Sequence, residues 1–70
     1  MIIKYIGSTI KRRRKELGIT QSVLAELAEV SKNTIYKLER GESNPTIEIL
    51  SKLLEILGLQ LIIDVKKSES

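Results

Sequence analysis

The chain has 70 residues, a formal net charge of +3, and neither cysteine nor histidine. These counts exclude disulfides and the usual zinc ligand sets, and they remove the commonest catalytic nucleophile and general base. We therefore expect one small domain that is not an enzyme and uses no metal or cofactor. No apolar run approaches the roughly 20 residues that span a membrane, and the absence of cysteine fits a cytoplasmic location.

The first predicted helix covers about residues 4–17 and ends at Gly18, which suits the left-handed residue that closes a helix. Its apolar stripe consists of Ile6, Ile10 and Leu17. Arg14 falls on the same stripe. Because a buried charge without a partner costs several kcal/mol, we expect Arg14 to meet a partner from another part of the chain.

Two shorter helices are predicted next, over about residues 21–28 and 32–40. Thr20 and Ser31 suit their N-caps, because a hydroxyl can accept from the free amides of the first turn, and Gly41 ends the second helix. Their apolar residues at helical spacing are Leu24, Ala25, Leu27, Ala28, Ile35 and Leu38. This apolar surface is too small for the pair to stand alone, so both helices must pack on a third element.

Positive charge gathers in residues 1–18 and 32–41, which points to a polyanionic partner. The remaining face of the second short helix carries Lys32, Asn33, Tyr36, Lys37 and Arg40. Amide and cationic side chains of this kind can bind base edges and phosphates, although a solvated polar face has the same composition. The basic run 11–15 spreads around its helix, so only one or two members, Arg12 or Arg13, would approach a phosphate.

A fourth helix is predicted between Thr46, a good N-cap, and Gly58, which closes it. Pro45 in the preceding loop disfavours helical angles at Asn44. The core-facing residues of this helix are Ile47, Leu50, Leu54 and Leu57, with Leu53 beside them.

The tail alternates as a strand would, with Leu59, Leu61, Ile63 and Val65 on one face. The alternative is a frayed continuation of the fourth helix, which Gly58 disfavours. A lone strand leaves its backbone donors and acceptors unpaired, so we expect it to pair with another molecule, most simply antiparallel with a second copy.

The segment ITQSVLAELAEVSKNTIYKLERGESNP resembles the helix-turn-helix of the Cro/C1-type (XRE) DNA-binding family, and the resemblance covers about residues 3–58. It implies an all-α, lambda-repressor-like fold of four helices, here followed by a short C-terminal β-strand. The short strand-ended form resembles the HipB-like antitoxin subgroup. The expected division is a DNA-binding domain at 1–58, a dimerisation strand at 59–66 and a disordered tail at 67–70.

The resemblance carries roles to individual residues. Lys32 and Asn33 would meet base edges at the start of the recognition helix, with Lys37 one turn further on the same face as Asn33. Thr34 would offer its methyl group to thymine or its hydroxyl to a phosphate, and Gln21 would donate to a phosphate. Tyr36 either contacts the sugar-phosphate backbone or packs its ring on the preceding helix. Arg40, Ser43 and Asn44 would follow the backbone, although Glu42 opposes phosphate. The DNA-binding candidates are Gln21, Ser31, Lys32, Asn33, Thr34, Tyr36, Lys37, Arg40 and Asn44.

The resemblance also implies a pairing of Arg14 with Glu39, which would fix the angle of the recognition helix. The expected function is sequence-specific binding of double-stranded DNA by a homodimeric repressor on a near-palindromic operator. The alternative is a HipB-like antitoxin that binds a partner toxin, a HipA-like kinase, and represses its own operon.

Overall fold

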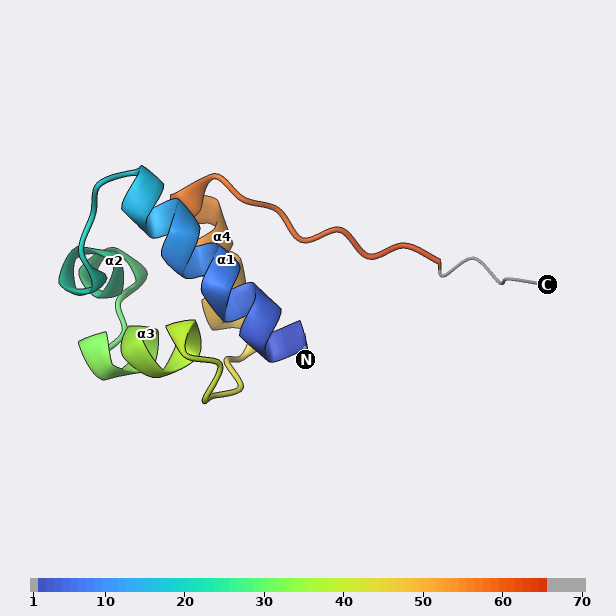
Figure 1. Ribbon diagram of the computed structural model, residues 1–70, viewed down its shortest axis with the longest axis horizontal. Helices are drawn as coiled ribbons and strands as arrows, with labels where there is room; N and C mark the ends of the chain where they lie inside the picture. Colours follow the sequence, from blue (N-terminus) through green and yellow to red (C-terminus); the bar gives the residue numbers. More distant parts are fainter. Residues whose placement is uncertain (1, 66–70) are drawn as a thin grey trace.

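The computed structural model describes residues 2–65 and contains four helices: α1 (Ile2–Glu16), α2 (Gln21–Ala28), α3 (Lys32–Glu39) and α4 (Ile47–Leu57). The predicted all-α arrangement of four helices is confirmed, with α1 beginning two residues earlier than expected. α1 and α4 lie side by side, α3 packs against α1, α2 packs against α4, and α2 and α3 pack against each other (Figure 1). Within residues 2–65, none of the helices is long and apolar enough to cross a membrane.

The helix boundaries follow the side chains that satisfy the free backbone groups. The hydroxyls of Thr20, Ser31 and Thr46 each accept from the backbone amide three residues later, at 3.1 Å, which confirms all three predicted N-caps. α4 ends at Gly58, whose φ of 69° lets the chain leave the helix in a left-handed turn. α2 ends in the same way at Glu29, a residue with a side chain, at φ 60°.

The four helices enclose one small core. Its buried hydrophobic members are Ile10, Leu24, Ala25, Ala28, Ile35, Leu38, Leu50, Leu53 and Leu57. Three residues predicted to face the core do not: Leu17 is 43% exposed, Leu27 57% and Ile47 73%. α1 ends before Leu17, Ile47 begins α4 ahead of the packed turns, and Leu27 lies at the edge of the buried face of α2.

Gly7 sets how closely α1 approaches α3. It is buried, and a Cβ atom at this position would collide with the carbonyl oxygen of Leu38 and stand 3.1 Å from that of Glu39. The backbones of the two helices therefore touch here, at a position where any side chain would separate them. The pattern of apolar residues contains no sign of this contact.

Arg13 ties α1 to the end of α4. Its Nε donates to the carbonyl oxygen of Leu57 at 2.8 Å, and its Nη1 lies 3.3 Å from a carboxylate oxygen of Glu16. A cation at the C-terminus of a helix satisfies a free carbonyl and favours the helix dipole. Arg13 thus has a structural partner, which leaves Arg12 as the more available of the two candidates for a phosphate.

The predicted C-terminal strand is not formed in the described residues. Residues 59–65 are extended without strand pairing, and they leave the body of the domain beside the α1/α4 end (Figure 1). The physical reason is that a strand needs a neighbour, and residues 2–65 of one copy contain no second strand to pair with it. The helical alternative is also wrong, because α4 ends at Leu57. The last residue of the predicted strand, residue 66, and the predicted disordered tail at 67–70 lie outside the described residues.

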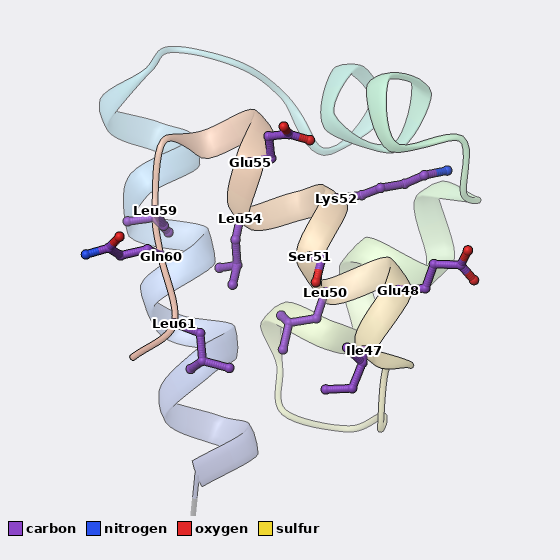
Figure 2. Close-up of a pocket in the computed structure, with 10 residues that line it drawn as sticks. All are labelled: Ile47, Glu48, Leu50, Ser51, Lys52, Leu54, Glu55, Leu59, Gln60 and Leu61. Carbon is purple, nitrogen blue, oxygen red and sulfur yellow. The ribbon is translucent and has the colours of Figure 1, made fainter. Parts of the chain in front are cut away.

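The first tail residues still pack on the domain. The amide of Leu59 donates to the carbonyl of Leu54 at 2.8 Å, and its side chain lies against the core. Beyond it, Leu61 faces Leu50 and Leu54 across an open groove between α4 and the tail (Figure 2). From Leu61 to Val65 every side chain is exposed.

Candidate nucleic-acid interface

α3 separates a buried face from an exposed polar one. Its buried residues are Ile35, Leu38 and Glu39. Its exposed residues are Lys32, Asn33, Tyr36 and Lys37, with Arg40 following as the C-cap. Asn33 and Lys37 lie one turn apart on the same side of α3, and Lys32 is the exposed first residue of the helix.

The hydroxyl groups at the start of α3 are used locally. Ser31 Oγ accepts from the amide of Thr34 at 3.1 Å and lies 2.9 Å from the hydroxyl of Thr34. This arrangement orients the half-buried Thr34 and holds the first turn of the helix in shape. Ser31 and Thr34 therefore contribute to the placement of Lys32 and Asn33, whatever contacts they make themselves.

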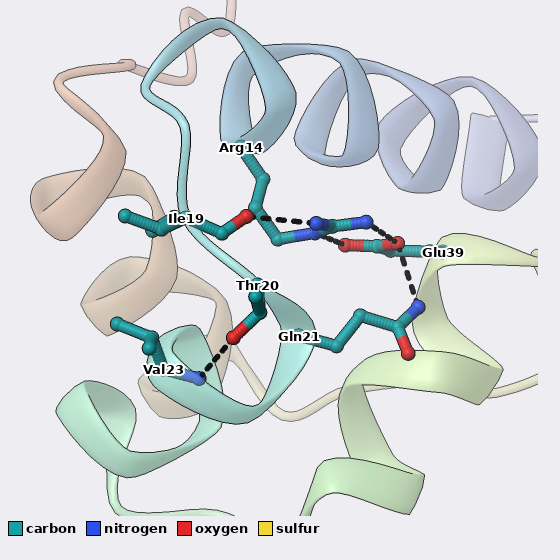
Figure 3. A network of polar contacts seen from close by, with 6 residues as sticks. All are labelled: Arg14, Ile19, Thr20, Gln21, Val23 and Glu39. Carbon is teal, nitrogen blue, oxygen red and sulfur yellow. Dashed lines mark hydrogen bonds and ion pairs between the residues drawn. The ribbon is translucent and has the colours of Figure 1, made fainter.

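Arg14 and Glu39 form the predicted ion pair, which is buried between α1 and α3 (Figure 3). Arg14 Nε donates to Oε2 at 2.6 Å and Nη2 donates to Oε1 at 3.0 Å. The remaining fork nitrogen, Nη1, donates to the carbonyl of Ile19 at 2.9 Å. The hydrogen bond to Glu39 is the main cause of a raised pKa at Arg14, and burial opposes it. The helix that carries the exposed polar face is thus anchored from inside.

Gln21 joins the same network, which the sequence did not indicate. Its Nε2 donates to Glu39 Oε1 at 3.0 Å (Figure 3). A carboxylate oxygen only accepts, so the nitrogen end of the amide must face Glu39, and its second N–H remains for another acceptor. The half-buried side chain at the start of α2 is therefore oriented by the last residue of α3.

Tyr36 and Arg40 form a stacked pair at the C-terminal end of α3. The guanidinium carbon of Arg40 lies 5.4 Å from the centre of the Tyr36 ring. Arg40 also donates from Nε to Oε2 of Glu42 at 3.0 Å, and this hydrogen bond is the main cause of a raised pKa at Arg40. Asn44 lies exposed in the following loop and Ser43 is half-buried. Within residues 2–65, no cluster of His, Cys, Asp or Glu is suited to hold a metal ion.

The sequence model of the family described as "Helix-turn-helix" matches residues 10–62 of this chain. The chain belongs to the helix-turn-helix family of Cro/C1 (XRE) type. α2 and α3 are its helix-turn-helix pair, and α3 is the recognition helix of the motif.

Two relatives give the extent of the likeness. A putative HTH-type transcriptional regulatory protein of Methanococcus vannielii is 43% identical over 56 residues, which are 80% of this chain but 17% of that protein. An uncharacterized HTH-type transcriptional regulator of Methanothermobacter thermautotrophicus is 39% identical over 56 residues, 80% of this chain and 81% of that protein. The chain thus spans about a sixth of the length of the first relative and most of the second.

Among solved structures, the clp gene regulator ClgR of Corynebacterium glutamicum is similar with a TM-score of 0.81 and 29% identity, over 84% of this chain and 63% of that one. The chain therefore has the lambda-repressor-like fold and belongs to a family of DNA-binding transcriptional regulators, which are not enzymes. The names of these three proteins describe regulators, so the narrower likeness to HipB-like antitoxins receives no support from them.

Proposed function

We propose that this helix-turn-helix domain binds double-stranded DNA sequence-specifically, with the N-terminal half of α3 in the major groove. The observation that supports this most directly is the division of α3 into two faces. Ile35, Leu38 and Glu39 fix the helix to the core, while Lys32, Asn33 and Lys37 extend from its other side into solvent. The polar face is thus rigidly held and free to meet a ligand.

The chemistry of that face fits base edges. An asparagine amide can bond bidentately to the N6 and N7 atoms of adenine, and lysine can donate to guanine O6 and N7. We assign these roles to Asn33 and to Lys32 and Lys37. Gln21 stands at the N-terminus of α2, where free backbone amides favour an anion, and its unused N–H is a donor for a phosphate.

We further propose that the domain acts as a homodimeric repressor on a near-palindromic site. A single recognition helix contacts few base pairs, whereas two copies related by a two-fold axis read half-sites about 34–36 Å apart. The tail supports a dimer because its alternating apolar residues from Leu61 to Val65 are exposed and its backbone groups lack a strand partner within residues 2–65.

The test is selection of bound sites from a random DNA pool with the purified chain, followed by gel shifts over a salt series. We expect an enriched site with two-fold symmetry and an affinity that falls steeply with salt, because phosphate contacts release counterions. Enrichment of no sequence would contradict sequence-specific binding. A single unrepeated half-site would leave sequence-specific binding intact and contradict the dimer.

The second candidate, an antitoxin that holds a toxin, is supported only by the same exposed tail, which could add a strand to another protein as well as to a second copy. Both candidates bind DNA and are compatible with a dimer, so the product of a neighbouring gene is tested for binding beside sedimentation of the purified chain. A dimer that dissociates when the tail is removed and does not bind that product favours the repressor, and a chain that binds that product through its tail favours the antitoxin.

A further inference from the structure

Arg40 is held between a ring and a carboxylate on the surface proposed to meet DNA. One side of its guanidinium lies over Tyr36 at 5.4 Å, and its Nε lies 3.0 Å from Glu42 Oε2. All three residues come from the C-terminal half of α3 and the loop that follows. The arrangement is local and exposed, so it has no part in the core.

The Arg40–Glu42 ion pair differs in location from the other ion pairs of the described residues. Arg14–Glu39 is buried, Arg13–Glu16 lies along α1, and Lys52–Glu29 joins α4 to the end of α2. Arg13 was also a candidate for a phosphate, but its Nε donates to the carbonyl of Leu57 as well, so its role is partly structural. Arg40–Glu42 is the pair that takes up a cation at the end of the recognition helix, where it was expected to follow the DNA backbone. A positive charge in that position is therefore already neutralised by the chain itself.

Phosphate and carboxylate compete for the same donors. Both are anions that bind the planar guanidinium fork, and Nε is one of the nitrogens that a bidentate partner uses. A phosphate at Arg40 must displace the Glu42 carboxylate or tolerate it a few ångströms away. With side chains 54% and 49% exposed, the pair is weak enough to exchange.

We propose that Glu42 is an internal competitor of DNA phosphate at Arg40, which lowers the affinity of this domain for DNA. The inference rests on the proposed DNA binding and names a residue that limits it. Tyr36 keeps the guanidinium in position while Glu42 is displaced, so the side chain does not have to be ordered again when a phosphate takes its place.

The test is Glu42→Gln, which keeps the shape of the side chain and removes its charge. We expect affinity for the selected site to rise about three- to tenfold at about 50 mM salt, and the dependence of log affinity on log salt to steepen by about 0.9, as for one additional phosphate contact. Both side chains of the pair are exposed, so thermal unfolding should stay unchanged.

Glu55→Gln is the matched control, because it changes net charge by the same amount on α4, and no described ion pair includes Glu55 (Figure 2). Its effect on DNA affinity measures the change in net charge alone, without any loss of a partner for Arg40. Glu42→Gln in an Arg40→Ala background is the second control, and there the gain should shrink to that of Glu55→Gln. An equal gain from Glu42→Gln and Glu55→Gln, or a full gain without Arg40, would overturn the inference while DNA binding stands. A parent chain that binds no DNA would overturn both proposals.

Discussion

Arg14 of α1 and Glu39 of α3 form a buried ion pair through two parallel hydrogen bonds of 2.6 and 3.0 Å. The same carboxylate accepts a third bond from Gln21 of α2, so three helices meet at one buried acceptor. The charge is fully paired, and the pair connects the core to the helix that carries the exposed polar face. Orientation of the recognition helix and stability of the domain are therefore linked.

Glu39→Ala should destabilise the domain by about 3–5 kcal/mol, because it leaves the charge of the buried Arg14 without a carboxylate and only the carbonyl of Ile19 to accept from it. A core of this size supplies only about 3–5 kcal/mol in total, so most of the chain should be unfolded at 25 °C. Circular dichroism during urea unfolding measures the loss. The pKa of Arg14 is raised, so its contribution is lost only above the ordinary arginine range, and the loss should be equal at about pH 7 and pH 9.

Glu16→Ala is the control for this prediction, because Glu16 belongs to an exposed pair with Arg13. It should change stability by less than about 1 kcal/mol. Equal unfolding midpoints for Glu39→Ala and the parent would show that the buried ion pair does not stabilise the domain.

Gly7→Ala should lower stability by about 1–3 kcal/mol, which is opposite to the gain of about 1 kcal/mol that alanine brings in an open helix. The added methyl group would meet the backbone of Leu38 and Glu39, which cannot move aside as a side chain could. Thermal unfolding compares it with Ser8→Ala, at the exposed neighbouring position of α1. A higher melting temperature for Gly7→Ala would contradict the close approach of α1 and α3.

Glu29→Gly should raise stability by about 0.5–1 kcal/mol. Glu29 ends α2 at φ 60°, where glycine avoids the strain that a Cβ atom introduces. The change removes the contact with Lys52 at 3.2 Å, but both side chains are exposed and such pairs contribute little. Lys52→Ala removes the contact alone and corrects for it. A melting temperature lower than that of Lys52→Ala would contradict the prediction.

Local signals predict most of the fold. Thr20, Ser31 and Thr46 act through bonds to residues three positions away, so their caps can be identified without a structure. Within the helices, the spacing of apolar residues at three and four positions predicted the buried residues correctly, as at Ile10, Leu24 and Leu53. The predictions were wrong at Leu17, Leu27 and Ile47, which are exposed. Leu17 lies beyond α1, Leu27 lies in the last turn of α2 and Ile47 is the first residue of α4, so each is at a helix end, where the period alone does not decide burial.

Contacts between distant segments were harder to predict. The pairing of Arg14 with Glu39 followed from the family resemblance, but the approach at Gly7, the bond from Arg13 to Leu57 and the bond from Gln21 to Glu39 depend on how the helices pack. The alternation in the tail predicts a strand that one chain cannot form alone. The identities of the DNA-binding residues remain a prediction, now with most of them located on one surface.

Removal of residues 61–70 should convert a dimer to a monomer in sedimentation velocity. This boundary keeps Leu59, whose side chain packs on the core and whose amide closes α4, so the remaining domain should fold. Ile63→Lys in the full chain is a milder variant that keeps the backbone and should weaken the dimer. A truncated chain that stays dimeric would place the interface elsewhere.

Asn33→Ala and Gln21→Ala should affect DNA binding in different ways. Loss of a bidentate contact from Asn33 should relax the preference at one base position of each half-site, at a cost of about 1–3 kcal/mol on the selected sequence and little on others. Loss of a phosphate donor at Gln21 should weaken binding to all sequences alike and reduce the salt dependence.

Repeated site selection and gel shifts with each variant measure both effects. Because Gln21 also bonds Glu39, its melting temperature must be compared first, and only the affinity measured where both variants are folded counts. Equal loss of specificity in the two variants would contradict the division between base and backbone contacts.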